Sequence, residues 1–153
     1  MEDNLYLVDS NILLRWLQPD DPDYPIVEAA LDRLVKLDAV LCYTSQNLAE
    51  FWNASTRPAS RNGFGLSPQE ADRRARHFET RLRLLADSIA VHEEWRKLLV
   101  EYGVSGVQVH DTRLVAAMRV YGVQRILTCN TADFKRFLNI VPVHPAELIQ
   151  LTT

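Results

Sequence analysis

Short apolar runs alternate with longer amphipathic segments along the chain. The first run, at residues 5–8, ends at Asp9-Ser10-Asn11, residue types that commonly end a strand and cap a helix. Apolar residues then recur at helical spacing over 12–17, until the prolines and aspartates of 19–22 interrupt them. This pattern predicts a strand followed at once by a helix, and a second helix over about 24–37.

The alternation continues to the C-terminal part of the sequence. Apolar runs predict four further strands, at 39–43, 88–91, 125–128 and 140–143. Helical spacing and start signals predict further helices after Thr44, over 68–86, over 93–102, from Asp111 to Gly122, briefly over 132–137, and after Pro145. The stretch from 56 to 68 is rich in Pro, Ser, Asn and Gly, so it is predicted to be a loop.

This order of elements is typical of an α/β fold. We expect a single domain over residues 1–153, with a central parallel sheet of about five strands and helices on both faces. A chain of 153 residues with 47% hydrophobic residues is large enough to bury one core. In such a sheet, binding sites lie at the carboxyl ends of the strands.

Composition excludes some classes of protein and of metal site. The sequence has no apolar run long enough to span a membrane and does not begin like a signal peptide, so we expect a cytoplasmic protein. Cys42 and Cys129 lie in short apolar stretches, which favours buried thiols over a disulfide. Without a Cys-x-x-Cys pair or closely spaced histidines a zinc site is not expected, so any metal would be held by oxygen.

Four acidic residues are candidates for such an oxygen site. Asp9 ends the first predicted strand, Glu50 lies in the helix after the second, Asp111 opens a helix, and Asp133 follows the fourth strand. Each alone would also suit a helix cap or a solvated position, but together they are placed to meet at one end of the sheet.

Converging carboxylates repel one another unless cations lie between them. Mg²⁺ or Mn²⁺ is the expected occupant, because both prefer oxygen ligands and can activate water to attack a phosphodiester without a covalent intermediate. His110, beside Asp111, is expected to face outward and is not included among the catalytic residues.

Four motifs resemble those of a known family. Residues 6–15, Tyr-Leu-Val-Asp-Ser-Asn-Ile-Leu-Leu-Arg, resemble the opening of PIN-domain proteins, especially the VapC-type toxins of VapBC toxin-antitoxin systems. Residues 47–52, 109–117 and 127–134 resemble the segments that carry the family's other acids. The resemblance covers about residues 5–148, and no acid of the motifs is missing.

The resemblance implies an α/β PIN fold and a ribonuclease that requires Mg²⁺ or Mn²⁺. It implies that the catalytic metal ligands are Asp9, Glu50, Asp111 and Asp133, and that the polar residues assisting them are Ser10, Thr128 and Asn130. It also implies RNA as substrate, an antitoxin protein as partner, and a homodimer.

The distribution of charge refines the expected contact with RNA. The net charge of −3 argues against a phosphate-binding surface, but residues 57–83 hold seven arginines against three acids, a local charge of +4. We expect Arg57 and Arg61, in and beside the predicted loop, to contact RNA. The alternative is a solvated helix face with ion pairs along the helix.

Three other functions remain to be weighed. A PIN nuclease that processes RNA outside a toxin-antitoxin pair would use the same catalytic residues. A PIN-like module that binds RNA or protein without cutting is less consistent with four retained acids. A phosphatase with Asp9 as nucleophile usually has a second aspartate two residues later, where this chain has Asn11.

Overall fold

The computed structural model describes residues 4–149. Its elements along the chain are β1 (Leu5–Val8), α1 (Ser10–Trp16), α2 (Tyr24–Lys36), β2 (Val40–Thr44), α3 (Ser45–Thr56), the 3₁₀ helix η1 (Ala59–Arg61), α4 (Pro68–Glu79), β3 (Arg83–Leu85), α5 (Ile89–Glu101), α6 (Gln108–Tyr121), β4 (Arg125–Leu127), the 3₁₀ helix η2 (Thr131–Phe134), β5 (Val141–Val143) and α7 (Pro145–Ile149). None of the described helices is both long and apolar enough to cross a lipid bilayer.

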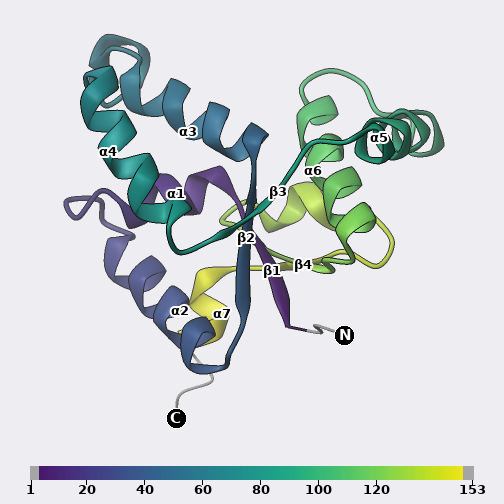
Figure 1. The fold of residues 1–153 in the computed structure, drawn as a ribbon, viewed down its shortest axis with the longest axis horizontal. Helices are drawn as coiled ribbons and strands as arrows, with labels where there is room; N and C mark the ends of the chain where they lie inside the picture. The colour runs from purple at the N-terminus through teal and green to yellow at the C-terminus, as the bar shows by residue number, and fades with distance from the viewer. Residues whose placement is uncertain (1–3, 150–153) are drawn as a thin grey trace.

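The strands form one parallel sheet with β1 at its centre. Within the described residues the sheet has five strands in the order β3-β2-β1-β4-β5, and all four neighbouring pairs are parallel. Tyr6 of β1 lies beside Leu41 of β2 and beside Arg125 of β4. The α/β fold class predicted from the sequence is confirmed, and so is the parallel sheet (Figure 1).

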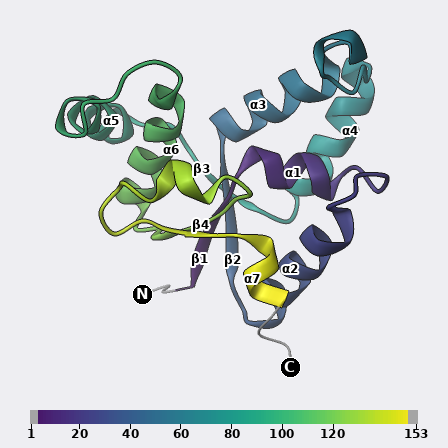
Figure 2. The same cartoon turned by 180° about the vertical axis from the view of Figure 1, so that it is seen from behind.

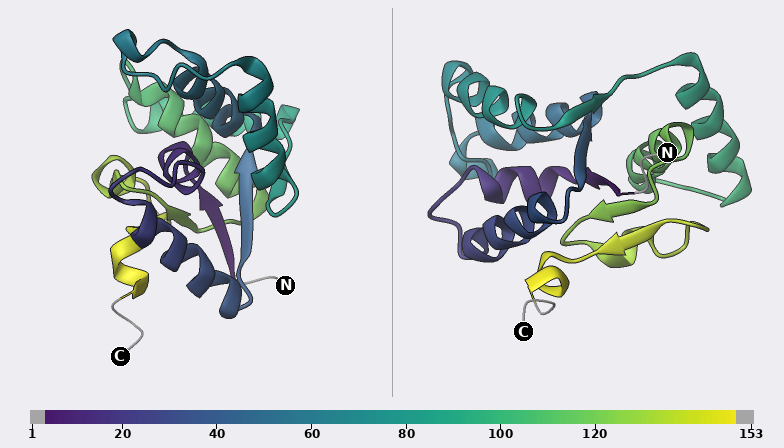
Figure 3. Two further views of the ribbon diagram at one scale, coloured as in Figure 1. Left: turned by 90° about the vertical axis from the view of Figure 1, so that its left-hand side faces the viewer. Right: turned by 60° about the horizontal axis from the view of Figure 1, so that its bottom comes forward.

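Alternating side chains of β1 enter two different cores. Tyr6 and Val8 pack with α1, α2, α4 and α7, whereas Leu7 packs with α5 and α6. Figures 1 and 2 show α1 to α4 and α7 on one side of the sheet and α5 and α6 on the other, and the right-hand view in Figure 3 gives the same separation. Helices therefore cover both faces, as a parallel sheet requires.

Two predictions in the middle of the chain are wrong. The helix predicted over 68–86 ends at Glu79, and residues 83–85 form β3. The strand predicted over 88–91 is the first turn of α5, because the Ser88 hydroxyl accepts a hydrogen bond from the Val91 amide at 3.1 Å and caps that helix. β3 lies at the sheet edge and buries only Leu85 of its three residues, and its short apolar run does not distinguish it from the end of a helix in the sequence.

Three smaller boundaries also differ from the prediction. Asp111 does not open its helix, because α6 begins one turn earlier at Gln108 and Asp111 lies in the first turn. The brief helix predicted over 132–137 is the 3₁₀ turn η2, and the predicted loop over 56–68 contains η1. These shifts leave each predicted acid near the carboxyl end of a strand.

Replacing Phe78 tests how α4 packs. Phe78 is fully buried, and its ring meets those of Tyr43 and Phe51 edge-on at centroid distances of 5.4 and 5.2 Å. We expect Phe78→Ala to lower the free energy of unfolding by about 3–5 kcal/mol, measured by urea denaturation, because it leaves a cavity. Phe64→Ala is the control, since Phe64 is 40% exposed, and an equal loss in the two variants would contradict this packing.

Candidate active site

One cavity of about 340 Å³ at the carboxyl end of the sheet collects the four acids predicted from the sequence. Asp9 follows β1, Glu50 comes from α3, Asp111 from α6, and Asp133 from η2. α3 and α6 lie on opposite sides of the sheet (Figure 1), and residues from both helices line the cavity. Residues far apart in the sequence therefore share one small acidic hollow.

Asp9 is the most buried and most firmly held of these acids. Its side chain is 6% exposed, and its Oδ1 accepts hydrogen bonds from the Ser10 amide at 2.8 Å and the Ser10 hydroxyl at 3.4 Å. Its Oδ2 accepts one from the Thr128 hydroxyl at 2.8 Å. Burial raises the pKa of Asp9, although the bonds from Thr128 and Ser10 oppose this shift.

Asn11 joins the β1 and β4 ends of the site, a role that the sequence analysis did not assign to it. Its Nδ2 donates to Asp9 Oδ2 at 3.3 Å and to Thr128 Oγ1 at 3.4 Å, and its Oδ1 accepts from the Cys129 amide at 3.2 Å. The Asn130 amide donates to Thr128 Oγ1 at 3.0 Å, and Asn130 itself lines the cavity. The signal available in the sequence was an amide side chain two residues after Asp9.

Glu50 is exposed, but one of its carboxylate oxygens is held by a buried neighbour. Gln46 Nε2 donates to Glu50 Oε1 at 3.0 Å and to the backbone oxygen of His110 at 2.8 Å. Sequence analysis missed Gln46, although a glutamine four residues before a glutamate shares its helix face. His110 is itself exposed, as expected, and contributes this carbonyl.

Asp111 is the acid whose pKa is affected by all three of the others. Burial, followed by the negative charges of Asp9, Asp133 and Glu50, raises the pKa of Asp111 from 3.8 to about 7. Asp133 is exposed at the start of η2 and contributes to the negative potential from the rim. Ionisation of all four carboxyl groups in the cavity is therefore unfavourable unless a positive charge compensates it.

The donor set fits a hard divalent cation that retains water ligands. Mg²⁺ and Mn²⁺ prefer carboxylate oxygens, and a cation would neutralise the negative charge of the four acids that line the cavity. In the arrangement seen over residues 4–149, no group of three or more His, Cys, Asp or Glu side chains could hold a metal ion as it stands. An ion bound here would therefore contact few carboxylates directly and complete its shell with water or substrate oxygens, as Mg²⁺ usually does.

Arg57 brings a positive charge to the same cavity. It lines the cavity, and its Nη2 donates to the Asn62 backbone oxygen at 3.2 Å. Gly63 lies so close that a Cβ there would overlap the Arg57 backbone carbonyl. The bond to Asn62 helps to hold the guanidinium of Arg57, whose buried Nε has no hydrogen-bond partner among the described residues.

The other arginines predicted to make the region basic are placed differently. Arg61 is exposed on η1 and does not line the cavity. On α4, Glu70 pairs with Arg73 at 3.1 Å and Arg74 at 3.4 Å, and Asp72 pairs with Arg76 at 3.0 Å. These helical ion pairs match the alternative reading of the local +4 charge, and they leave Arg57 as the arginine of segment 57–83 that faces the acids.

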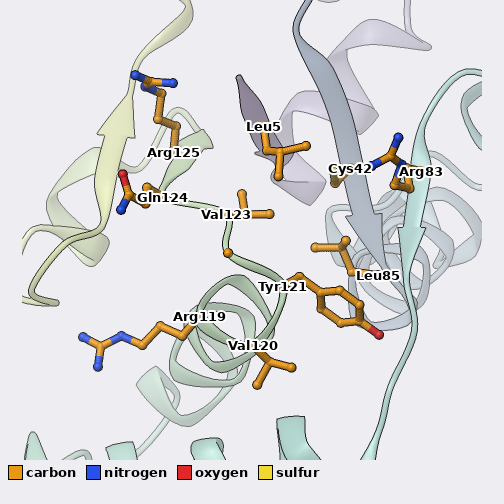
Figure 4. Close-up of a pocket in the computed structure, with 11 residues that line it drawn as sticks. Leu5, Cys42, Arg83, Leu85, Arg119, Val120, Tyr121, Val123, Gln124 and Arg125 are labelled. Atoms are coloured by element: carbon orange, nitrogen blue, oxygen red, sulfur yellow. The ribbon is translucent and has the colours of Figure 1, made fainter. Parts of the chain in front are cut away.

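A larger cavity of about 790 Å³ lies elsewhere, and its chemistry differs. It is built around Leu5, Leu85 and Val123, near the amino ends of the central strands, and contains no acidic residue. Figure 4 shows Arg83, Arg119 and Arg125 at its margins, with their guanidinium groups pointing away from one another. Size alone does not identify the reactive site, and the convergence of carboxylates favours the smaller cavity.

The fold and the cavity define the class as an α/β protein with an acidic site at the carboxyl end of a parallel sheet. Sequence comparison then identifies the family. A model of the PIN domain matches residues 6–138. The chain therefore belongs to the PIN domain family, as its motifs predicted. A search among curated proteins finds no match.

Solved structures with the same fold come from toxin-antitoxin complexes and toxins. A chain of VapBC2 from Rickettsia felis, crystallised with a promoter DNA fragment, aligns with a TM-score of 0.69 and 18% identity over 92% of this chain and 98% of that one. VapC20 from Mycobacterium tuberculosis, described as a sarcin-ricin loop cleaving toxin, aligns at 0.63 with 17% identity over 88% and 98%. A chain of DNA-bound VapBC from Salmonella typhimurium aligns at 0.67 with 15% identity over 92% and 97%. At these identities the likeness establishes the shared fold.

Neutralising Asp111 should stabilise the protein in the absence of divalent metal. The pKa of Asp111 is raised to about 7, so ionising it costs folding free energy at any pH above its unfolded value of 3.8. We expect Asp111→Asn to raise Tm in chelator by roughly 2–4 °C at pH 8, corresponding to about 1 kcal/mol after discounting for solvent access. The gain should be complete above pH 7 and should shrink as the pH falls towards 4, where both states bind the proton.

The control for this measurement is Asp20→Asn, because Asp20 is exposed in the turn before α2. It should leave Tm unchanged at each pH. A lower Tm for Asp111→Asn at pH 8 in chelator would contradict the electrostatic account of the cavity.

Proposed function

We propose that this protein is a metal-dependent endoribonuclease, the toxin of a VapBC-like toxin-antitoxin pair. The observation that carries the proposal is that four carboxylates from four separate segments line one cavity of a PIN-domain fold. Their shared negative charge suits a cation-assisted phosphodiester hydrolysis and has no evident structural purpose. Reaction of this kind needs no nucleophilic side chain of the protein.

Asp9, Glu50, Asp111 and Asp133 are the residues that would hold Mg²⁺ or Mn²⁺, a few of them by direct contact and the others through water ligands of the ion. A bound divalent ion would lower the pKa of a water molecule and offset the charge that develops on the phosphate oxygens. Asp9 is oriented for this role by Ser10 and Thr128, which bind its two carboxylate oxygens. Asn130 supports Thr128 through its backbone amide, so these polar residues act through Asp9.

RNA is the substrate class that we propose, with Arg57 as a phosphate contact. Arg57 lines the acidic cavity and carries a positive charge there, so the outer nitrogens of its guanidinium can bind a phosphate oxygen beside the reacting bond. Arg61 lies outside this cavity and is proposed as a contact for a more distant part of the strand. The likeness to VapC20, a toxin described as cleaving the sarcin-ricin loop, supports RNA over DNA.

An antitoxin is the protein partner that we propose. The solved structures that resemble this chain include VapBC complexes from Rickettsia felis and Salmonella typhimurium, both bound to DNA. A partner covering the acidic cavity would block access of RNA. We also propose that the chain forms a homodimer, as the resemblance to VapC-type toxins implies. Cys42 and Cys129 are both thiols, which is consistent with the reducing cytoplasm that such a pair would occupy.

Incubation with a mixed RNA pool tests the nuclease and its metal requirement together. We expect cleavage in Mg²⁺ or Mn²⁺, none in chelator, and ends with a 3′-hydroxyl and a 5′-phosphate, read by end mapping of the fragments. Asp9→Asn should lower the cleavage rate by at least about 100-fold, since it removes a carboxylate that fits as a metal ligand. Asp20→Asn serves as the matched control on an exposed loop.

Two outcomes would count against this proposal. Cleavage that persists in chelator would remove the metal from the reaction. Cleavage by Asp9→Asn at the rate of the unchanged protein would show that the acidic cavity is not the catalytic site.

Salt-dependent RNA binding tests the role of Arg57. In metal-free buffer, Arg57→Ala should weaken binding of single-stranded RNA and reduce the slope of log K against log salt by about 0.7, the value for one lost phosphate contact. Arg61→Ala removes the same charge outside the cavity, at the other proposed RNA contact, so it should also lower the slope but should reduce the cleavage rate less than Arg57→Ala does. Equal salt slopes for Arg57→Ala and the unchanged protein would rule out a phosphate contact at Arg57.

A further inference from the structure

We propose that Gln46 is a positioning residue that fixes the Glu50 carboxylate relative to Asp111. The inference rests on the proposed function, because it assigns a role in metal binding to a residue outside the four acids. Gln46 lies on α3 one turn before Glu50 and does not line the acidic cavity itself. Any effect on the site must therefore pass through the groups that it contacts.

The side-chain amide of Gln46 connects two helices from opposite faces of the sheet. Its Nε2 donates to Glu50 Oε1 at 3.0 Å and to the backbone oxygen of His110 at 2.8 Å. A primary amide has two N–H donors, so both are committed to these acceptors. Because Asp111 directly follows His110, the carboxylate on α3 is tied to the backbone of α6 at the residue beside another acid.

The chemistry of the two contacts determines the orientation of the amide. Both acceptors, a carboxylate and a backbone carbonyl, can only receive hydrogen bonds in their usual protonation states. The opposite orientation would place the Gln46 carbonyl oxygen against two acceptors, which would be repulsive. A residue without a side-chain N–H could not make either contact.

Burial gives the contact its rigidity and also a cost. Gln46 is 8% exposed, whereas Glu50 is exposed and would otherwise retain the rotamer freedom of a long surface side chain. Gln46 Oε1 is buried and has no hydrogen-bond partner among the described residues. A buried acceptor without a partner destabilises the fold, so an apolar residue at this position would pack better. The two hydrogen bonds that Gln46 donates are what an amide provides and an apolar residue would not.

The physical consequence is that Glu50 is held in place before any cation binds. The entropy cost of ordering Glu50 is then incurred when the protein folds, so it does not weaken metal binding. Removing the amide should free the carboxylate and weaken metal binding without removing any of the four acids. Loss of such an outer hydrogen-bond partner typically lowers metal affinity by about 10–100-fold.

The test measures Mn²⁺ binding by isothermal titration calorimetry in the absence of RNA. We expect Gln46→Met, which keeps the length of the side chain, to weaken Mn²⁺ binding by about tenfold. In cleavage assays the Mg²⁺ concentration for half-maximal activity should rise by a similar factor, with the rate largely recovered at saturating Mg²⁺. Gln69→Met is the matched control, because Gln69 is exposed on α4.

A double-mutant cycle separates positioning from a general loss of packing. If Gln46 acts through Glu50, Gln46→Met should have no further effect on Mn²⁺ binding in a Glu50→Ala background. Gln46→Asn, too short to reach both acceptors, should behave like Gln46→Met and provides a second variant if the first does not fold. Tm in chelator, measured for each variant, verifies that folded proteins are compared.

The possible results distinguish this inference from the function on which it rests. If the unchanged protein binds Mn²⁺ and cuts RNA while both Gln46 variants bind Mn²⁺ equally well, Gln46 has no positioning role and the nuclease proposal stands. If the loss is equal with and without Glu50, the effect is one of packing and the inference is also overturned. If the unchanged protein neither binds Mn²⁺ nor cuts RNA, the proposed function is overturned and the inference with it.

Discussion

The burial of a carboxylate at the end of the central strand is the constraint on which the rest of this structure depends. An unpaired buried charge costs several kcal/mol, and Asp9 is compensated by donors from its own helix start and from the end of β4. The Thr128 hydroxyl reaches it because β1 and β4 are adjacent and parallel, with Val8 beside Leu127. The sheet topology thus comes first, and the acidic cavity is built on it.

The remaining acids are arranged by elements that approach this fixed point from both faces of the sheet. α3 packs on the face that contains Tyr6 and Val8, and α6 packs on the face that contains Leu7, so Glu50 and Asp111 arrive from opposite cores. Burial, and then the negative charges of Asp9, Asp133 and Glu50, raise the pKa of Asp111. A fold that places like charges together in this way gives up stability at the position where a cation can restore it.

Much of this arrangement could be predicted from the sequence, because the relevant signals are local. Asp9 follows an apolar strand directly, Glu50 lies in the helix after the second strand, and Asp111 lies in the first turn of its helix. Segment 80–91 was misassigned because β3 is a short edge strand with one buried residue, and its pairing with β2 decides its conformation. Gln46 and Asn11 escaped notice because their roles depend on partners far away in the sequence, the carbonyl of His110 and the amide of Cys129.

The close approach of Gly63 to the backbone of Arg57 makes the loop after α3 less free to vary than its exposure suggests. The turn through Pro58 and Gly65 folds back on the helix end, with the Gly65 amide donating to the Arg57 carbonyl at 3.0 Å. Any side chain at position 63 would have to push this carbonyl aside and tilt the guanidinium that faces the acids. Sequence drift at an outwardly unremarkable surface turn would therefore alter the charge balance at the mouth of the cavity, while the four carboxylates themselves stayed intact.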